Sequence, residues 1–99
     1  MTNQQKRMLG RIRNFVKAVD FYRPEDYEFK RFEVQERGAG SHPVVHVFTE
    51  VGRKHDDASE EAVYFRTKRH YMIGPTGIAQ LDSDEGWVEA DITSRGTEE

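Results

Sequence analysis

The stretch AVYFRTKRHYMI, residues 62–73, alternates between two kinds of side chain and decides the fold. In an extended strand, successive side chains point to opposite faces. One row is mostly apolar, so we expect it to face the core; it contains Val63, Phe65, Thr67, Arg69, Tyr71 and Ile73. The other row should face water; it contains Ala62, Tyr64, Arg66, Lys68, His70 and Met72. Arg69 is the exception in the apolar row, and we expect it to reach an edge of the sheet or to pair with a carboxylate.

The flanking segments predict further strands. Residues 27–37 lose their alternation between Lys30 and Arg31, and a β-bulge there would return the two apolar pairs to one face. These pairs are Tyr27 with Phe29 and Phe32 with Val34. Residues 44–51 are apolar on both faces, which is typical of a strand inside a sheet. The turn GPTG leads into a strand at residues 78–81, and residues 87–92 alternate as a short fifth strand with Val88, Ala90 and Ile92 on one side.

The N-terminal segment has the periodicity of an amphipathic helix. An apolar stripe recurs at steps of three and four residues and contains Met8, Leu9, Ile12, Phe15, Val16 and Val19. Thr2 or Asn3 can cap the start, and Pro24 stops the helix. The fold prediction is therefore a single α+β domain over residues 1–93, with this helix packed on an antiparallel β-meander of four to five strands. Residues 94–99 are expected to form a flexible acidic tail.

The composition limits the class of protein. The chain has 99 residues, a net charge of −3 and no cysteine, so it forms no disulfide and no thiolate metal site. No apolar run reaches the length of a signal peptide or a membrane span, which favours a cytoplasmic protein without membrane contact. Charge is unevenly distributed. Residues 1–23 contain six basic side chains and one acidic, whereas residues 82–99 contain seven acidic and one basic.

Two basic surfaces are candidate binding sites. The outer face of the helix carries Lys6, Arg7, Arg11, Arg13 and Lys17, and the water-facing row of residues 62–73 carries Tyr64, Arg66, Lys68 and His70. On the sheet, Arg66 and Lys68 would meet phosphates while a base stacks on Tyr64. The alternative is a solvated face whose bases pair with Glu28, Glu50 or Glu89 on other strands. The helix suits a nucleic-acid backbone, an acidic groove on another protein, or solvent alone.

Catalytic and metal patterns are weak. His42 and His46 are four residues apart, which on a strand is about 13 Å and too far for shared ligation. His55, Asp56 and Asp57 fit a solvated loop, and GAGSHP lacks the lysine and helix of a phosphate-binding loop. Ser41 and His42 are adjacent, so their side chains point apart in an extended chain. We therefore expect no enzymatic activity, no cofactor and no metal site.

A resemblance covers roughly residues 42–77. The valine-rich strand ends in EVG, an acidic loop follows, and the pattern then contains Arg66, Arg69, His70, Ile73, Gly74, Pro75 and Gly77. This combination resembles short uncharacterised proteins of actinobacterial phages. The resemblance implies a small accessory protein, made in the bacterial cytoplasm, that binds a component of the host; it implies no activity.

The leading hypothesis is a non-enzymatic interaction module that binds a host protein through its basic helix and sheet surfaces. The alternative is a nucleic-acid-binding protein that uses the face formed by Tyr64, Arg66, Lys68 and His70. A homodimer that pairs the basic helix with the acidic tail is a third possibility.

Overall fold

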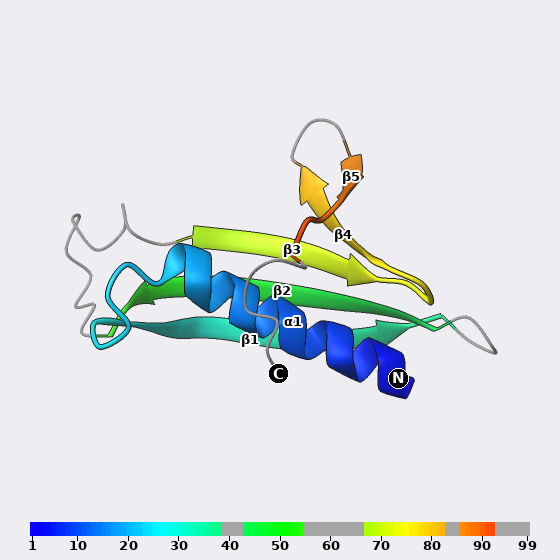
Figure 1. Cartoon of the computed structure of the whole chain (residues 1–99), viewed down its shortest axis with the longest axis horizontal. Coiled ribbons are helices and arrows are strands. Elements are labelled where there is room, and N and C mark those ends of the chain that lie inside the picture. The colour runs from blue at the N-terminus through cyan, green and yellow to red at the C-terminus, as the bar shows by residue number, and fades with distance from the viewer. Residues whose placement is uncertain (39–42, 55–66, 83–85, 93–99) are drawn as a thin grey trace.

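A computed structural model describes residues 1–38, 43–54, 67–82 and 86–92 of the chain. Its elements are α1 (Asn3–Asp20), β1 (Tyr27–Arg37), β2 (Val44–Arg53), β3 (Thr67–Ile73), β4 (Ile78–Asp82) and β5 (Gly86–Glu89). The strands form one five-stranded sheet in the order β1-β2-β3-β4-β5, and every neighbouring pair is antiparallel. Helix α1 lies along one face of the sheet, while β4 and β5 turn away from the other strands (Figure 1). The predicted helix on a β-meander is therefore confirmed.

Helix α1 begins with a capping box. The backbone N–H of Gln5 donates to the Thr2 hydroxyl, and the backbone N–H of Thr2 donates to the Gln5 side chain, which satisfies two amides that have no partner within the helix. The fully buried Gln5 side chain also donates to the carbonyl of Pro43 at 2.9 Å. Of the two residues proposed as the cap, Thr2 is thus the one that caps α1, and Gln5 ties its first turn to the start of β2.

The apolar stripe of α1 is shorter than predicted. Met8, Ile12 and Val16 are buried, whereas Val19, at the end of the predicted stripe, is 39% exposed. The last turn is attached to β3 by a polar contact instead, because Asp20 accepts two hydrogen bonds from the Arg69 guanidinium. The helix ends at Asp20, before Pro24, and the backbone N–H of Phe21 closes it by donating to the carbonyl of Lys17.

The core lies between α1 and the central strands. Its members come from α1, β1, β2, β3 and the segment after β5; they are Met8, Ile12, Val16, Tyr27, Val45, Val47, Val51, Tyr71, Ile73 and Ile92. Tyr71 and Ile73 belong to the apolar row predicted for residues 62–73, and both are fully buried. The row is confirmed as far as the chain is described, since residues 62–66 lie outside the described part. Strand β2 runs between β1 and β3, as its two apolar faces indicated.

Strand β1 contains the predicted bulge. Its pairing with β2 shifts between Phe29 and Arg31, which leaves Lys30 as the extra residue. The shift changes the parity of the strand, so Phe29, Phe32 and Val34 all pack against the core next to buried Tyr27. The bulge therefore accounts for the loss of alternation in residues 27–37, because it returns the apolar side chains on both sides of it to one face.

The fifth strand differs from its prediction. It covers Gly86–Glu89 instead of residues 87–92, and Ile92 reaches the core only after the strand has ended. Val88 keeps the parity predicted for it, since it pairs with Gln80 on the side of the sheet that holds Tyr71, but it is 44% exposed because the β4–β5 pair turns away from α1 (Figure 1). Within the described residues, no helix combines the length and the apolar character needed to cross a membrane.

Candidate functional site

The face of the sheet opposite α1 is not covered by any other described element (Figure 1). We call it the open face. Alternate residues of β2 and β3 point to it, and these are His46, Phe48, Glu50, Lys68, His70 and Met72. The water-facing row is thus confirmed for Lys68, His70 and Met72, although only Lys68 is exposed and the other two are half-buried. Tyr64 and Arg66, the other predicted residues of this surface, lie outside the described residues.

Four rings gather at the centre of the open face and form what we call the aromatic cluster: His46, Phe48, His70 and Trp87. Phe48 lies opposite His70 in the β2–β3 register, and their rings stack with centroids 4.1 Å apart. Trp87 makes edge-to-face contacts with both histidines, with ring centroids 4.9 Å from His70 and 6.2 Å from His46. The β3–β4 register places Leu81 on the open face, as it does Met72. Trp87 on β5 pairs with Leu81, so it points to the same face and reaches the cluster.

The two histidines of the aromatic cluster contact each other directly. Nδ1 of His46 lies 3.0 Å from Nε2 of His70, so one nitrogen donates a hydrogen bond and the other accepts it. At least one ring must be neutral for this bond to form. Burial lowers the pKa of both imidazoles because it penalises the charged form, and the positive charge of Arg37 lowers both further. His70 is therefore a neutral ring near pH 7 and does not add positive charge to the surface.

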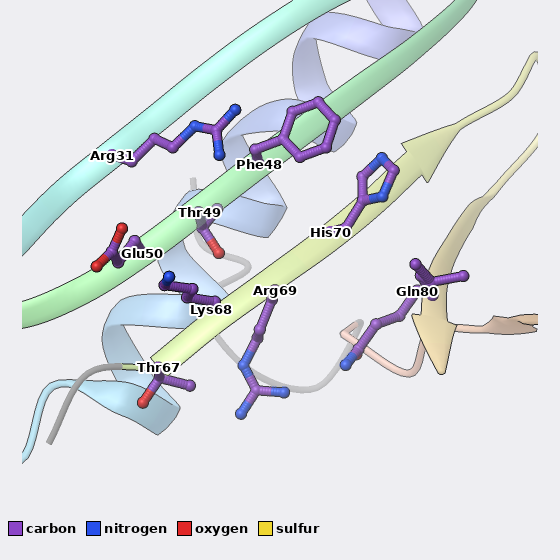
Figure 2. A pocket seen from close by; sticks show the side chains of 10 residues that line it. Arg31, Phe48, Thr49, Glu50, Thr67, Lys68, Arg69, His70 and Gln80 are labelled. Carbon is purple, nitrogen blue, oxygen red and sulfur yellow. The ribbon is translucent and has the colours of Figure 1, made fainter. Parts of the chain in front are cut away.

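A shallow pocket of about 400 Å³ opens beside the aromatic cluster. Ten residues from β1 to β4 line it: Arg31, Phe48, Thr49, Glu50, Thr67, Lys68, Arg69, His70, Gln80 and Leu81. Figure 2 shows Arg31, Phe48 and His70 following one another across three strands, whereas Arg69 points away from them. The Arg31 guanidinium lies 4.8 Å from the centre of the Phe48 ring, which is the geometry of a cation–π contact.

Charge on the described part of the open face is balanced. The register places three basic residues there, Arg31, Arg37 and Lys68, and four acidic residues, Glu28, Glu33, Glu50 and Glu89. A fourth basic residue, the bulge residue Lys30, reaches this face through its contact with Glu28. Several of them are already paired: Lys30 donates to Glu28 at 3.0 Å, and Arg31 donates to Glu33 at 2.6 and 2.9 Å. The hydrogen bonds from Gln35 and Arg31 also lower the pKa of Glu33. The described part of the open face therefore has an aromatic centre and a rim of charged residues whose net charge is zero.

The basic residues of α1 form a separate surface on the other side of the sheet. Lys6, Arg7, Arg11, Arg13 and Lys17 are all exposed, as predicted. They do not form a single row. At 100° per residue, Arg7 and Arg11 lie on one flank of α1, and the other three lie on the opposite flank. Arg13 is partly occupied, since its guanidinium lies 4.3 Å from the centre of the Phe32 ring. The helix and the aromatic cluster thus face different directions and do not combine into one site.

The described part of the chain adds no support for the catalytic and metal-binding patterns considered in the sequence. No group of three or more His, Asp or Glu side chains gathers there around a point that a metal ion could occupy. Ser41, His42, His55, Asp56 and Asp57 lie outside the described residues. The main residues that sequence reasoning missed are His46, Phe48 and Trp87. The alternation of residues 44–51 already placed His46 and Phe48 on one face, but the register that brings them to His70 is not visible in the sequence.

Comparison with protein-family models, with curated proteins and with solved structures gave no significant match.

Proposed function

We propose that this protein is a non-enzymatic interaction module that binds a protein partner through the aromatic cluster on its open face. The observation that carries the proposal is the position of four rings at the centre of a sheet face that no other described element covers, with charged residues around them. Protein interfaces have this organisation, since aromatic anchors near the centre supply most of the binding energy and a polar rim surrounds them. Trp87, at 38% exposed, is the ring that a partner would cover most.

The charge of the open face favours a protein over a nucleic acid. Nucleic-acid binding gains most of its free energy from cations that neutralise phosphates. On the described part of this face the four basic residues are matched by four acidic ones, and the neutral His70 adds no charge. The partner that fits is a protein surface with an apolar or aromatic side chain for the pocket beside Phe48 and Leu81, flanked by groups of both charges.

Single-stranded nucleic acid is the second candidate. Phe48 and Trp87 would stack on bases and Lys68 would contact a phosphate, joined by Tyr64 and Arg66 as the sequence analysis expects. This mode requires that affinity fall steeply as the salt concentration rises. Binding to a protein with balanced charge would change little over the same range, so the salt dependence separates the two candidates.

The resemblance to actinobacteriophage proteins suggests the source of the partner. It supports an accessory protein made in the cytoplasm of an actinobacterial host and directed at a host protein. We therefore propose that the partner is recovered from actinobacterial lysate with the full-length chain as bait, and is then identified and purified.

The decisive step is the affinity of the purified partner for variants of the two surfaces. Phe48→Asp and Trp87→Asp should each weaken binding at least about tenfold, because truncated aromatic anchors commonly cost 2 kcal/mol or more. Arg7→Ala/Arg11→Ala, on the far side of the sheet, is the matched control and should bind like the natural chain. Equal binding by all variants that remain folded by circular dichroism would refute the proposal. Binding that nuclease abolishes would replace it with the nucleic-acid mode, and self-association in sedimentation would replace it with a homodimer.

A further inference from the structure

We propose that His46 and His70 form a two-histidine binding site for a divalent transition-metal ion, with Cu²⁺ bound more tightly than Zn²⁺. The inference rests on the juxtaposition of two ring nitrogens, Nδ1 of His46 and Nε2 of His70, 3.0 Å apart on neighbouring strands. It is independent of the proposed protein partner, since the metal would bind the isolated chain.

The spacing of the two nitrogens matches that of two ligands on one ion. Metal–nitrogen bonds to histidine are about 2.0–2.1 Å long, so two such nitrogens lie about 2.9 Å apart at a right angle and about 3.3 Å apart at a tetrahedral angle. The observed 3.0 Å falls between these values. Each nitrogen is now aimed at the other, so both rings would have to turn, each by roughly 45°, to point at a shared ion.

The surroundings hold the rings in this position. The β2–β3 register fixes the two backbones, with Phe48 opposite His70 and Met72 opposite His46. Phe48 stacks on the His70 ring, and the edge contact with Trp87 restricts it further. Both imidazoles are half-buried between these neighbours. The backbone positions of the two ligands are thus set before any ion binds.

The same surroundings set the class of ion and limit its affinity. Imidazole suits Cu²⁺, Ni²⁺ and Zn²⁺, and affinity at a given nitrogen site rises to Cu²⁺ and falls at Zn²⁺. Mg²⁺ and Ca²⁺ require oxygen ligands, so we expect neither to bind. Arg31 and Arg37 oppose any cation at this place, while Glu33 and Glu50 on the same face partly offset them. Two protein ligands leave the remaining positions to water, so the site should be exchangeable and of micromolar affinity.

Trp87 provides the readout, because it is the single tryptophan of the chain and its ring lies 4.9 Å from His70. Bound Cu²⁺ quenches the fluorescence of a nearby indole. The full-length chain, free of any histidine tag, is titrated at pH 7 with CuCl₂ in a buffer that does not coordinate metals. Calorimetry with CuCl₂, ZnCl₂ and MgCl₂ gives the stoichiometry and the order of affinities.

The four histidines of the chain supply matched variants. We expect one Cu²⁺ per chain, saturable quenching, and at least about tenfold weaker binding in His46→Asn and in His70→Asn, since even residues that only support a metal ligand change affinity by that factor. The double variant His42→Asn/His55→Asn should bind like the natural chain. Trp87→Phe should lose the fluorescence signal but keep the calorimetric binding. Quenching that persists in both single variants, or that disappears in the double variant, would overturn the proposal. Circular dichroism checks that each variant is folded.

Discussion

Replacing Arg69 by methionine removes the charged partner of Asp20 while keeping most of the aliphatic volume of the side chain. In the natural chain the guanidinium donates to both carboxylate oxygens of Asp20, at 2.8 and 2.9 Å. The Asp20 side chain is only 7% exposed, and that of Arg69 is 25% exposed. The substitution therefore leaves a carboxylate enclosed between the end of α1 and β3 without its cation.

The expected cost follows from this burial. Removing one partner of a buried ion pair typically costs about 3–5 kcal/mol, because the remaining charge stays desolvated. Arg69 keeps some contact with water, so we expect a cost at or just below the lower end of this range, about 2–3 kcal/mol. For a domain of this size, each kcal/mol lowers the melting temperature by about 4–8 °C, so a fall of roughly 10–20 °C is predicted.

Urea denaturation of Arg69→Met, followed by circular dichroism, measures this loss. Arg31→Met is the matched control, because it breaks a similar contact with Glu33 in which the two side chains are 49% and 43% exposed. Exposed pairs contribute about 0–1 kcal/mol, so the control should lose far less. The double variant Asp20→Asn/Arg69→Met should recover part of the stability lost in Arg69→Met. A loss below about 0.5 kcal/mol in Arg69→Met, or equal losses in both arginine variants, would refute the reasoning from burial.

Three further substitutions test the fold. Gly10→Ala should stabilise the chain by up to about 1 kcal/mol in urea denaturation, because Gly10 is exposed within α1 and a methyl group there meets no atom within 4 Å. Gln5→Leu should cost about 1–3 kcal/mol in the same assay, because it leaves the carbonyl of Pro43 and the start of α1 unsatisfied. Burial raises the pKa of Tyr71 to about 12, whereas a tyrosine in the unfolded chain ionises near 10. The unfolded state therefore loses its proton first, and stability should fall by about 1.4 kcal/mol per pH unit between pH 10 and 12; Tyr71→Phe should remove this component of the fall.

Local features of the sheet could be predicted because they depend on parity. The bulge at Lys30 follows from two apolar pairs of opposite parity in one strand, and the burial of Tyr71 and Ile73 follows from the rhythm of residues 67–73. Pairing of Arg69 with a carboxylate was one of the two outcomes expected for a cation in the apolar row, the other being an edge of the sheet. The identity of that carboxylate as Asp20 could not be predicted, since it depends on where the last turn of α1 crosses β3.

The aromatic cluster could not be predicted from the sequence, because it depends on the register of the strands. His46 and His70 are 24 residues apart, and they become diagonal neighbours only in the register that pairs Phe48 with His70. A register shifted by two residues keeps every apolar side chain on the same face but separates these rings. Trp87 required the register of two further strand pairs. Parity predicts which face a residue occupies, whereas the register decides which residues meet there.

The central claim, that the aromatic cluster is the binding surface, is tested most directly by nuclear magnetic resonance of the ¹⁵N-labelled full-length chain with its purified protein partner. The chain has one tryptophan, so it gives one indole N–H signal, that of Trp87. The account predicts that the partner shifts or broadens this indole signal together with the backbone amides of Phe48 and His70, while the amides of Arg7 and Arg11 stay in place. Changes confined to α1, with the Trp87 indole signal unmoved at saturation, would contradict it.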